Sequence, residues 1–150
     1  MEKMQFKIEI NVPVANVFEA MLGKDTFKQW TAVFNPSSDF EGSWEKGAKI
    51  LFVGTDEQGK RGGMVGVIRE LIPNKFVSIE YLGLIDGEKE ITDGPEIVDW
   101  VGSFENYTFE ESADKTIVIV DIDMNEQMKE YFAETYPKAL EKLKEICEVK

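Results

Sequence analysis

The fold is decided by the end of the chain, residues 116–148, which read TIVIVDIDMNEQMKEYFAETYPKALEKLKEICE. Residues 116–124 are rich in β-branched side chains and predict a strand. Asn125 is a good N-cap, so we expect a helix from Asn125 to about Glu148. Its apolar side chains form one broad stripe with Lys and Glu opposite, and such a helix must pack against a sheet. The stripe comprises Met128, Tyr131, Phe132, Thr135, Tyr136, Ala139, Leu140, Leu143 and Cys147.

A proline interrupts this helical pattern at position 137. The ring of Pro137 crowds the preceding turn, and the residue has no N–H to donate to the carbonyl of Ala133. We therefore expect the C-terminal helix to kink or split near Tyr136.

Working back along the chain, short strands and turns come before the helix. Residues 39–44, 48–55, 64–72 and 75–84 predict strands, because Gly-, Pro- or Asn-containing turns separate them. Residues 98–110 predict a further strand, joined by a turn at 111–115 to the strand at 116–124. Residues 85–97, IDGEKEITDGPEI, are polar and carry two Asp-Gly breaks, so we expect a long loop there. Such short connections indicate antiparallel pairing.

The N-terminal segment adds one strand and two short helices. Residues 4–10 alternate between apolar and polar side chains, which is typical of a half-buried strand. Pro13 suits a first helical position, Gly23 can end the helix that follows, and residues 25–30 predict a second helix. This order predicts an α+β fold in which a curved antiparallel sheet wraps around the long C-terminal helix. We expect residues 1–150 to form a single domain with an apolar cavity between helix and sheet.

Composition narrows the functions that we consider. The chain of 150 residues is 43% hydrophobic and 31% charged, which is typical of a soluble globular protein. Its net charge of -12 argues against binding nucleic acid or an anionic membrane surface. The sequence has no histidine, which excludes His-dependent triads and His metal sites, and one cysteine, which excludes an internal disulfide. Without a signal peptide or a membrane span, the expected compartment is the cytoplasm.

Three landmarks along the chain resemble one known family. They are residues 10–13 (INVP) with 17–21 and 27–30, residues 66–81 (GVIRELIPNKFVSIEY), and residues 107–118 with 139–144. These segments resemble the SRPBCC or START-like superfamily, whose helix-grip fold is shared with birch-pollen-allergen-like proteins. Within it, the chain is most similar to the activator-of-heat-shock-protein-90-ATPase-like family. Relatives in this superfamily include lipid carriers, hormone receptors, aromatase/cyclases and co-chaperone domains, so the resemblance implies a fold more firmly than a function.

The candidate site consists of side chains expected to face the cavity. The aromatic members can either line a cavity or fill an ordinary core. Glu105 shares strand parity with Tyr107, so it is expected to face the concave side, where it can act as an acid or base; a bulge or an edge position would instead keep it in water. The candidate cavity residues are Trp30, Trp44, Phe52, Tyr81, Trp100, Glu105, Tyr107, Met128, Phe132 and Tyr136.

Other residues carry weaker signals. Arg69 suits either a ligand carboxylate or a surface ion pair. The carboxylates at 121, 123 and 126 do not match an EF-hand loop, so we expect no metal and no cofactor. Cys147 lies on the apolar stripe and predicts an inert thiol, while the Gly-rich residues 59–63 predict a hairpin turn.

Three functions stay open. The first is a carrier or sensor that binds a small apolar or lipid-like molecule in the cavity. The second is a co-chaperone-like protein that contacts a chaperone through an exposed apolar patch. The third is a cyclase- or aromatase-like enzyme, which the missing histidine makes the weakest of the three. Neither the ligand nor the oligomeric state follows from the sequence.

Overall fold

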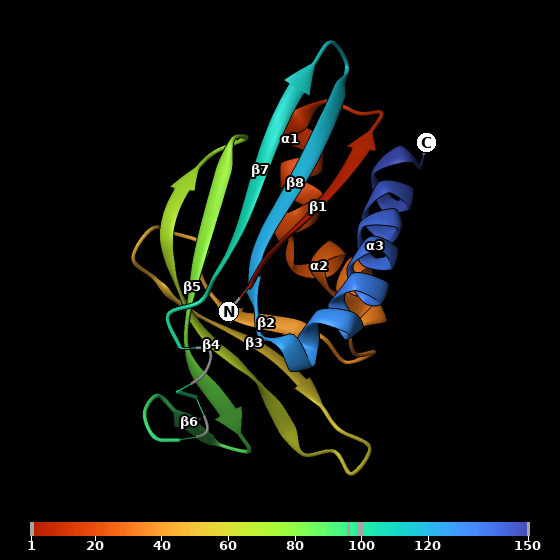
Figure 1. Ribbon diagram of the computed structural model, residues 1–150. Helices are drawn as coiled ribbons and strands as arrows, with labels where there is room; N and C mark the ends of the chain where they lie inside the picture. The colour runs from red at the N-terminus through yellow and green to blue at the C-terminus, as the bar shows by residue number, and fades with distance from the viewer. Residues whose placement is uncertain (1, 96, 99–100, 150) are drawn as a thin grey trace.

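The computed structural model describes residues 2–95, 97–98 and 101–149. In this part of the chain, eight antiparallel strands form one sheet in the order β1-β8-β7-β5-β4-β3-β2, with β6 paired to β5. The strands are β1 (Glu2–Ile10), β2 (Asp39–Gly42), β3 (Lys49–Thr55), β4 (Arg61–Ile72), β5 (Phe76–Asp86), β6 (Lys89–Ile91), β7 (Phe104–Ser112) and β8 (Lys115–Met124). The helices are α1 (Val14–Leu22), α2 (Lys24–Trp30), the short 3-10 helix η1 (Thr31–Val33) and α3 (Glu126–Glu148). Figure 1 shows the sheet curving past α1 and α2 toward α3, which confirms the predicted fold class.

The first strand follows its predicted alternation. Phe6 and Ile8 are half-buried and Ile10 is fully buried, while the polar residues between them are exposed. β1 pairs along its whole length with β8, so the first and last strands of the chain lie side by side at one edge of the sheet. The C-terminal part of α3 packs on β1 and closes that side.

The two short helices bury one face each, as their apolar spacing predicts. Val17 and Met21 of α1 and Phe27 and Trp30 of α2 enter the core. The indole Nε1 of Trp30 donates a hydrogen bond of 3.0 Å to the carbonyl of Met21, which fixes the large ring beneath α1. Pro13 is the N-cap of α1 and not its first helical residue, a shift of one position from the prediction.

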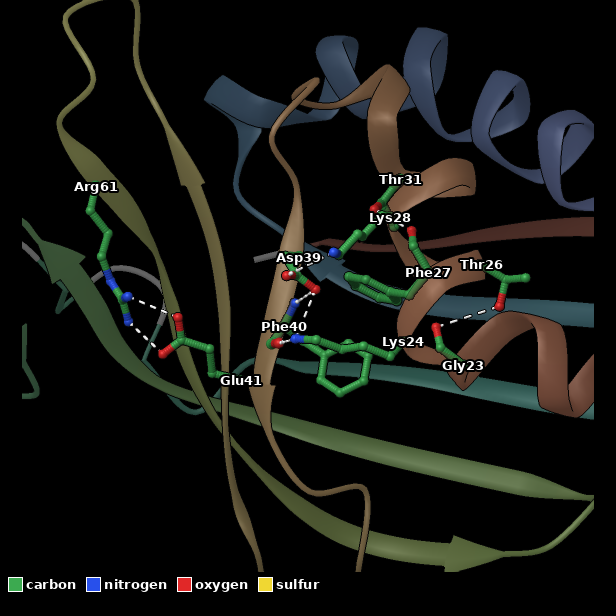
Figure 2. Close-up of polar contacts among 10 residues, drawn as sticks. All are labelled: Gly23, Lys24, Thr26, Phe27, Lys28, Thr31, Asp39, Phe40, Glu41 and Arg61. Atoms are coloured by element: carbon green, nitrogen blue, oxygen red, sulfur yellow. Dashed lines mark hydrogen bonds and ion pairs between the residues drawn. The ribbon is translucent and has the colours of Figure 1, made fainter.

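Polar contacts tie α2 to the strand that follows it (Figure 2). The ammonium groups of Lys24 and Lys28 lie 3.0 and 3.7 Å from the carboxylate of Asp39, the first residue of β2. Next to them, the rings of Phe27 and Phe40 meet edge to face with centroids 5.2 Å apart. These contacts hold α2 against β2, and so they orient the aromatic side of α2 toward the concave face of the sheet.

The long helix is continuous from Glu126 to Glu148, with Pro137 inside it. The predicted split is therefore wrong, and the exposed side of the helix accommodates the proline ring. Figure 1 shows the ribbon of α3 changing direction after its first turns, as expected of a helix that carries an internal proline. The stripe is buried only in its second half, because the first half overhangs a hollow instead of the sheet. Tyr136, Ala139, Leu140 and Leu143 are buried, whereas Met128 and Tyr131 are exposed.

Two predicted segments differ from the structure. The expected loop at 85–97 contains the end of β5, a tight turn at Gly87, and the three-residue strand β6. The expected strand at 98–110 begins only at Phe104, because Gly102 has a φ of 84° and turns the chain. Likewise, β2 stops at Gly42, whose φ of 112° ends the strand two residues before Trp44. In each case a glycine with positive φ, which sequence patterns do not reveal, sets the boundary.

Candidate functional site

A cavity of about 570 Å³ lies between the concave face of the sheet and the first half of α3. This volume is within the range of small-molecule sites. The walls come from α2, η1, the five strands β3, β4, β5, β7 and β8, and α3, so the cavity is bounded by elements from most of the length of the chain. Its lining residues are Phe27, Trp30, Thr31, Phe34, Ser38, Phe52, Met64, Tyr81, Leu84, Ser103, Glu105, Tyr107, Ile122, Asp123, Met124, Asn125, Gln127, Met128, Tyr131, Phe132 and Tyr136.

A buried carboxylate is the main polar feature of this cavity. Glu105 is only 7% exposed, and it accepts hydrogen bonds from two tyrosine hydroxyls. The hydroxyl of Tyr81 donates to Oε1 and the hydroxyl of Tyr136 donates to Oε2. Tyr107 lies in the same wall and is 2% exposed. We call Tyr81, Glu105, Tyr107 and Tyr136 the carboxylate–tyrosine cluster.

Three elements assemble this cluster. Alternation along β7 turns Glu105, Tyr107 and Phe109 inward, as the shared parity of these residues predicts. On the neighbouring strand, Tyr81 is held by two backbone hydrogen bonds of 2.9 Å, with the carbonyl of Ser103 and the N–H of Gly102. These bonds hold the start of β7 beside Tyr81.

The third element is α3, which brings Tyr136 to the cluster. Its ring stacks on Phe6 of β1, with centroids 5.0 Å apart and an interplanar angle of 10°. This stack fixes the ring so that its hydroxyl points at Glu105. The side chain is 2% exposed, so the hydrogen bond to Glu105 is shielded from water.

Burial dominates the electrostatics of the cluster. It raises the pKa of the Glu105 carboxyl above its ordinary value, although the hydrogen bonds from Tyr136 and Tyr81 partly oppose the rise. Burial and the nearby charge of Glu105 also raise the pKa values of Tyr81, Tyr107 and Tyr136 well above the usual range. The phenols are therefore protonated at neutral pH and act as donors to the carboxylate. A raised carboxyl pKa inside a cavity is a feature of binding and catalytic sites.

Eight of the ten candidate residues line this cavity: Trp30, Phe52, Tyr81, Glu105, Tyr107, Met128, Phe132 and Tyr136. Trp44 is not among the lining residues. Its ring packs against Phe40 and Phe52 at centroid distances of 5.4 and 5.8 Å, because β2 ends before it and the chain turns. Trp100 lies outside the residues that the structure describes.

The sequence reasoning missed several lining residues. Phe34 follows η1, and its ring lies 5.3 Å from that of Tyr136 and 5.7 Å from that of Phe132. Tyr131 belongs to the helical stripe and lies at the cavity edge, where its hydroxyl donates to the carbonyl of Phe34 at 3.3 Å. The helical spacing of Tyr131 from Met128 was a usable signal, whereas nothing in the local sequence indicated Phe34.

The weaker candidates have structural roles. Arg69 forms an exposed ion pair with Glu80 at 2.6 Å and lies at an irregularity in the pairing of β4 with β5. Within residues 2–95, 97–98 and 101–149, no group of three or more acidic or thiol side chains is arranged to hold a metal ion. Burial raises the pKa of the Cys147 thiol to about 11, so it is a poor nucleophile at neutral pH.

A second hollow of about 450 Å³ lies beside the turn between β3 and β4. Its basic residues are already paired: Lys60 with Asp86 at 2.6 Å, and Arg61 with Glu41 at 2.8 Å. Figure 2 shows the two parallel contacts of the Arg61–Glu41 pair. The Gly-rich residues 59–63 therefore form the end of a hairpin, as the sequence predicts, and not a phosphate loop.

A family model matches the chain, and several solved structures share its fold. The family model described as Activator of Hsp90 ATPase homolog 1-like protein matches residues 11–148. Protein NE0264 from Nitrosomonas europaea has a similar structure, with a TM-score of 0.72 at 18% identity over 95% of this chain and 92% of that one. The Aha1 dimer from Colwellia psychrerythraea gives a TM-score of 0.71 at 22% identity over 99% and 98%. CalU16 from Micromonospora echinospora gives 0.66 at 16% identity over 97% and 76%.

No curated protein matches the chain significantly. In the described part of the chain, no helix has the length and apolar character needed to cross a membrane. At such low identities the structural likeness shows the fold, so the chemistry of the cavity has to support any function.

Proposed function

The chain belongs to the Activator of Hsp90 ATPase homolog 1-like family, and from this premise we propose that it binds one small, largely apolar molecule between α3 and the sheet. The observation that carries the proposal is the cavity of about 570 Å³, whose walls are mainly aromatic and aliphatic. Removing apolar ligand surface from water into such a space contributes roughly 25 cal/mol per Å². The buried polar side chains of the carboxylate–tyrosine cluster lie together in one wall, which supports recognition of one polar end of the ligand. The cytoplasmic location expected from the sequence stays a prediction.

The mouth of the cavity supports entry along α3. Met128 is 40% exposed and Tyr131 is 41% exposed, yet both line the cavity. Val33 of η1, on the segment that Tyr131 contacts through Phe34, is 42% exposed. We call these three exposed apolar side chains the mouth patch, and we propose that an apolar ligand meets them before it enters.

The test uses an uncharged fluorescent dye, Nile red, whose emission rises in apolar surroundings. We expect saturable binding at one site and a higher unfolding midpoint when the dye is present, because only the folded state has the site. Met64→Trp fills part of the cavity from β4 and is expected to weaken dye binding about tenfold or more. Ile72→Trp is the matched control, since it introduces the same side chain at an exposed position of the same strand. Absence of saturable binding, or equal effects of the two variants, argues against the proposal.

Catalysis in the same cavity is the second candidate. The observation that favours it is the buried Glu105, because burial raises the pKa of this carboxyl above its ordinary value, as in many general acids and bases. The hydroxyls of Tyr81 and Tyr136 already donate to Glu105, so their role in this candidate is to hold the carboxyl in position. An enzyme of this kind, of the cyclase type expected from the sequence, loses turnover in Glu105→Gln while Nile red binding persists.

A chaperone contact is the third candidate, and the mouth patch favours it. The family description refers to an activator of an Hsp90 ATPase, and exposed apolar side chains suit a protein interface. The test is direct binding to a purified chaperone of that class, with Val33→Ser/Tyr131→Ser as the interface variant. Loss of chaperone binding with retained dye binding separates this candidate from the first.

A further inference from the structure

We propose that the cavity selects a cationic ligand: an organic amine, protonated at neutral pH, that carries an aromatic or other apolar body. This inference rests on the proposed binding function and adds the charge of the ligand to it. The case comes from the charges, rings and hydrogen-bond acceptors that line the cavity.

The charges of the lining are all negative. Among the described residues, the lining contains two carboxylates, Glu105 and Asp123, and no Lys or Arg. Asp123 already has partners: its Oδ1 lies 3.6 Å from the ammonium of Lys3, and its Oδ2 accepts a hydrogen bond of 3.0 Å from the N–H of Phe104. Glu105 forms no ion pair with any described residue. The buried carboxylate therefore lacks a counter-cation, which a ligand ammonium group supplies.

The walls around this carboxylate suit an ammonium group. The lining contains the indole ring of Trp30, the phenol rings of Tyr81, Tyr107 and Tyr136, and several phenylalanine rings. An aromatic face attracts a cation through its quadrupole, and the attraction strengthens when water is excluded. Leu84, Ile122 and three methionines add aliphatic and thioether surface to the lining, so the apolar body of an amine also gains from burial.

The hydrogen-bonding groups of the cluster also favour an ammonium ligand. The hydroxyls of Tyr81 and Tyr136 already donate to Glu105, so what they offer a ligand is their oxygen lone pairs. The carboxylate oxygens likewise only accept when ionised. The cluster therefore presents acceptors, which match the N–H donors of an ammonium group. A fatty-acid carboxylate brings a second negative charge and no donor into the same poorly hydrated space, which is unfavourable.

The positive end of α3 also borders the cavity, and its charge acts in the opposite direction. Asn125, Gln127 and Met128 at the start of α3 line the cavity, and a helix N-terminus carries roughly half a positive charge. That charge is reduced, because the side chain of Asn125 accepts the N–H of Met128 at 3.0 Å and Glu126 adds a full negative charge in the first turn. The carboxylate of Glu105, which has no ion-pair partner among the described residues, therefore outweighs it.

The experiment compares three ligands with the same ring and different heads: naphthylethylamine, naphthylethanol and naphthylacetate. Binding to the full chain is measured by calorimetry at pH 7 and fixed ionic strength. We expect the amine to bind about tenfold or more tightly than the acetate, with the alcohol between them. Glu105→Gln is expected to weaken the binding of the amine about tenfold and to leave the binding of the alcohol nearly unchanged. Retained binding of the alcohol also shows that the variant is folded.

Glu110→Gln is the control. It removes the same charge as Glu105→Gln, but from an exposed position of the same strand. It is expected to change the affinity of the amine less than about twofold. Equal or tighter binding of the acetate in the native protein overturns the charge selection while the binding function stands. Failure of all three ligands and of Nile red overturns the binding function itself. The affinities of the three ligands for the native protein test the charge selection even if Glu105→Gln does not fold.

Discussion

The hydroxyl of Tyr136 donates a hydrogen bond to Oε2 of Glu105, although the two residues are 31 positions apart in the chain. This bond joins the helix to the sheet across the floor of the cavity. Both side chains are buried, so the bond is shielded from competing water. It therefore couples the stability of the fold to the charge of the site.

Replacing this tyrosine tests the coupling. Tyr136→Phe keeps the ring that stacks on Phe6 but removes one donor from a buried carboxylate. We expect the free energy of unfolding to fall by about 1–3 kcal/mol, measured by urea denaturation at pH 7. Tyr131→Phe is the control, because its hydroxyl is bonded at the exposed surface, and we expect a change below about 1 kcal/mol. A smaller loss of unfolding free energy in Tyr136→Phe than in Tyr131→Phe contradicts a stabilising hydrogen bond between Tyr136 and Glu105.

The pH dependence of stability gives a second test. The pKa of Glu105 is raised in the folded protein from its ordinary value of 4.5, chiefly by burial. Its proton therefore stabilises the fold fully at pH values below the ordinary pKa, and this contribution is lost as the pH rises through the folded pKa. Glu105→Gln does not titrate, so its stability relative to the native protein is expected to increase as the pH rises from about 4 to 8.

The measurement is a set of urea titrations across this pH range for the native protein and two variants. Glu110→Gln is the control, because it removes a carboxylate from an exposed position of the same strand. Comparing variants is necessary because other carboxylates have lowered pKa values, such as that of Asp86 beside Lys60, and these act with the opposite sign. A pH-independent difference for Glu105→Gln would falsify the raised pKa.

Local patterns in the sequence predicted most of the architecture. The strict alternation of β1 and the helical stripe of α3 located both elements, and strand parity turned Glu105 and Tyr107 inward. These features depend only on neighbours in the sequence, which is why periodicity reveals them. The resemblance of the three landmarks then connected the elements into the helix-grip arrangement.

The features that the sequence did not predict depend on contacts between distant segments. Val98 and Val101 are apolar and suggested a strand, but both are exposed beside the turn at Gly102. The pairing of Tyr81 and Tyr136 with the two oxygens of Glu105 depends on the register of β5 with β7 and on the position of α3. No local signal encodes these distances, so the sequence indicated the members of the cluster without their hydrogen bonds.

The wall of the cavity on α3 provides a third prediction. Phe132 is half-buried and borders the cavity, with Phe34 as its ring neighbour. We expect Phe132→Ala to lower the free energy of unfolding by about 1–3 kcal/mol, because water already reaches one side of the ring. Phe109→Ala, on a ring that is 5% exposed and not part of the lining, is expected to cost about 3–5 kcal/mol. Only Phe132→Ala is expected to weaken Nile red binding. A larger loss of stability in Phe132→Ala, or a larger loss of dye binding in Phe109→Ala, contradicts the position of the cavity beside Phe132.

The last prediction concerns two adjacent glycines of β4 next to the cavity wall. Gly63 has a φ of 142°, and a Cβ atom there lies 1.8 Å from the carbonyl oxygen of Phe52. Gly62 has no such restriction, since the nearest atom to its Cβ position is the carbonyl oxygen of Ile85 at 3.7 Å.

We expect Gly63→Ala to lower the free energy of unfolding by about 2–4 kcal/mol, because β3 and β4 have to move apart to admit the methyl group. Gly62→Ala is expected to change it by less than about 1 kcal/mol. Since Phe52 lines the cavity, the same movement is expected to weaken Nile red binding in Gly63→Ala alone. Urea titration and dye titration of the two variants measure both effects. If the two substitutions are equally mild, β3 and β4 do not approach each other this closely, and the wall that Phe52 contributes is not fixed by Gly63.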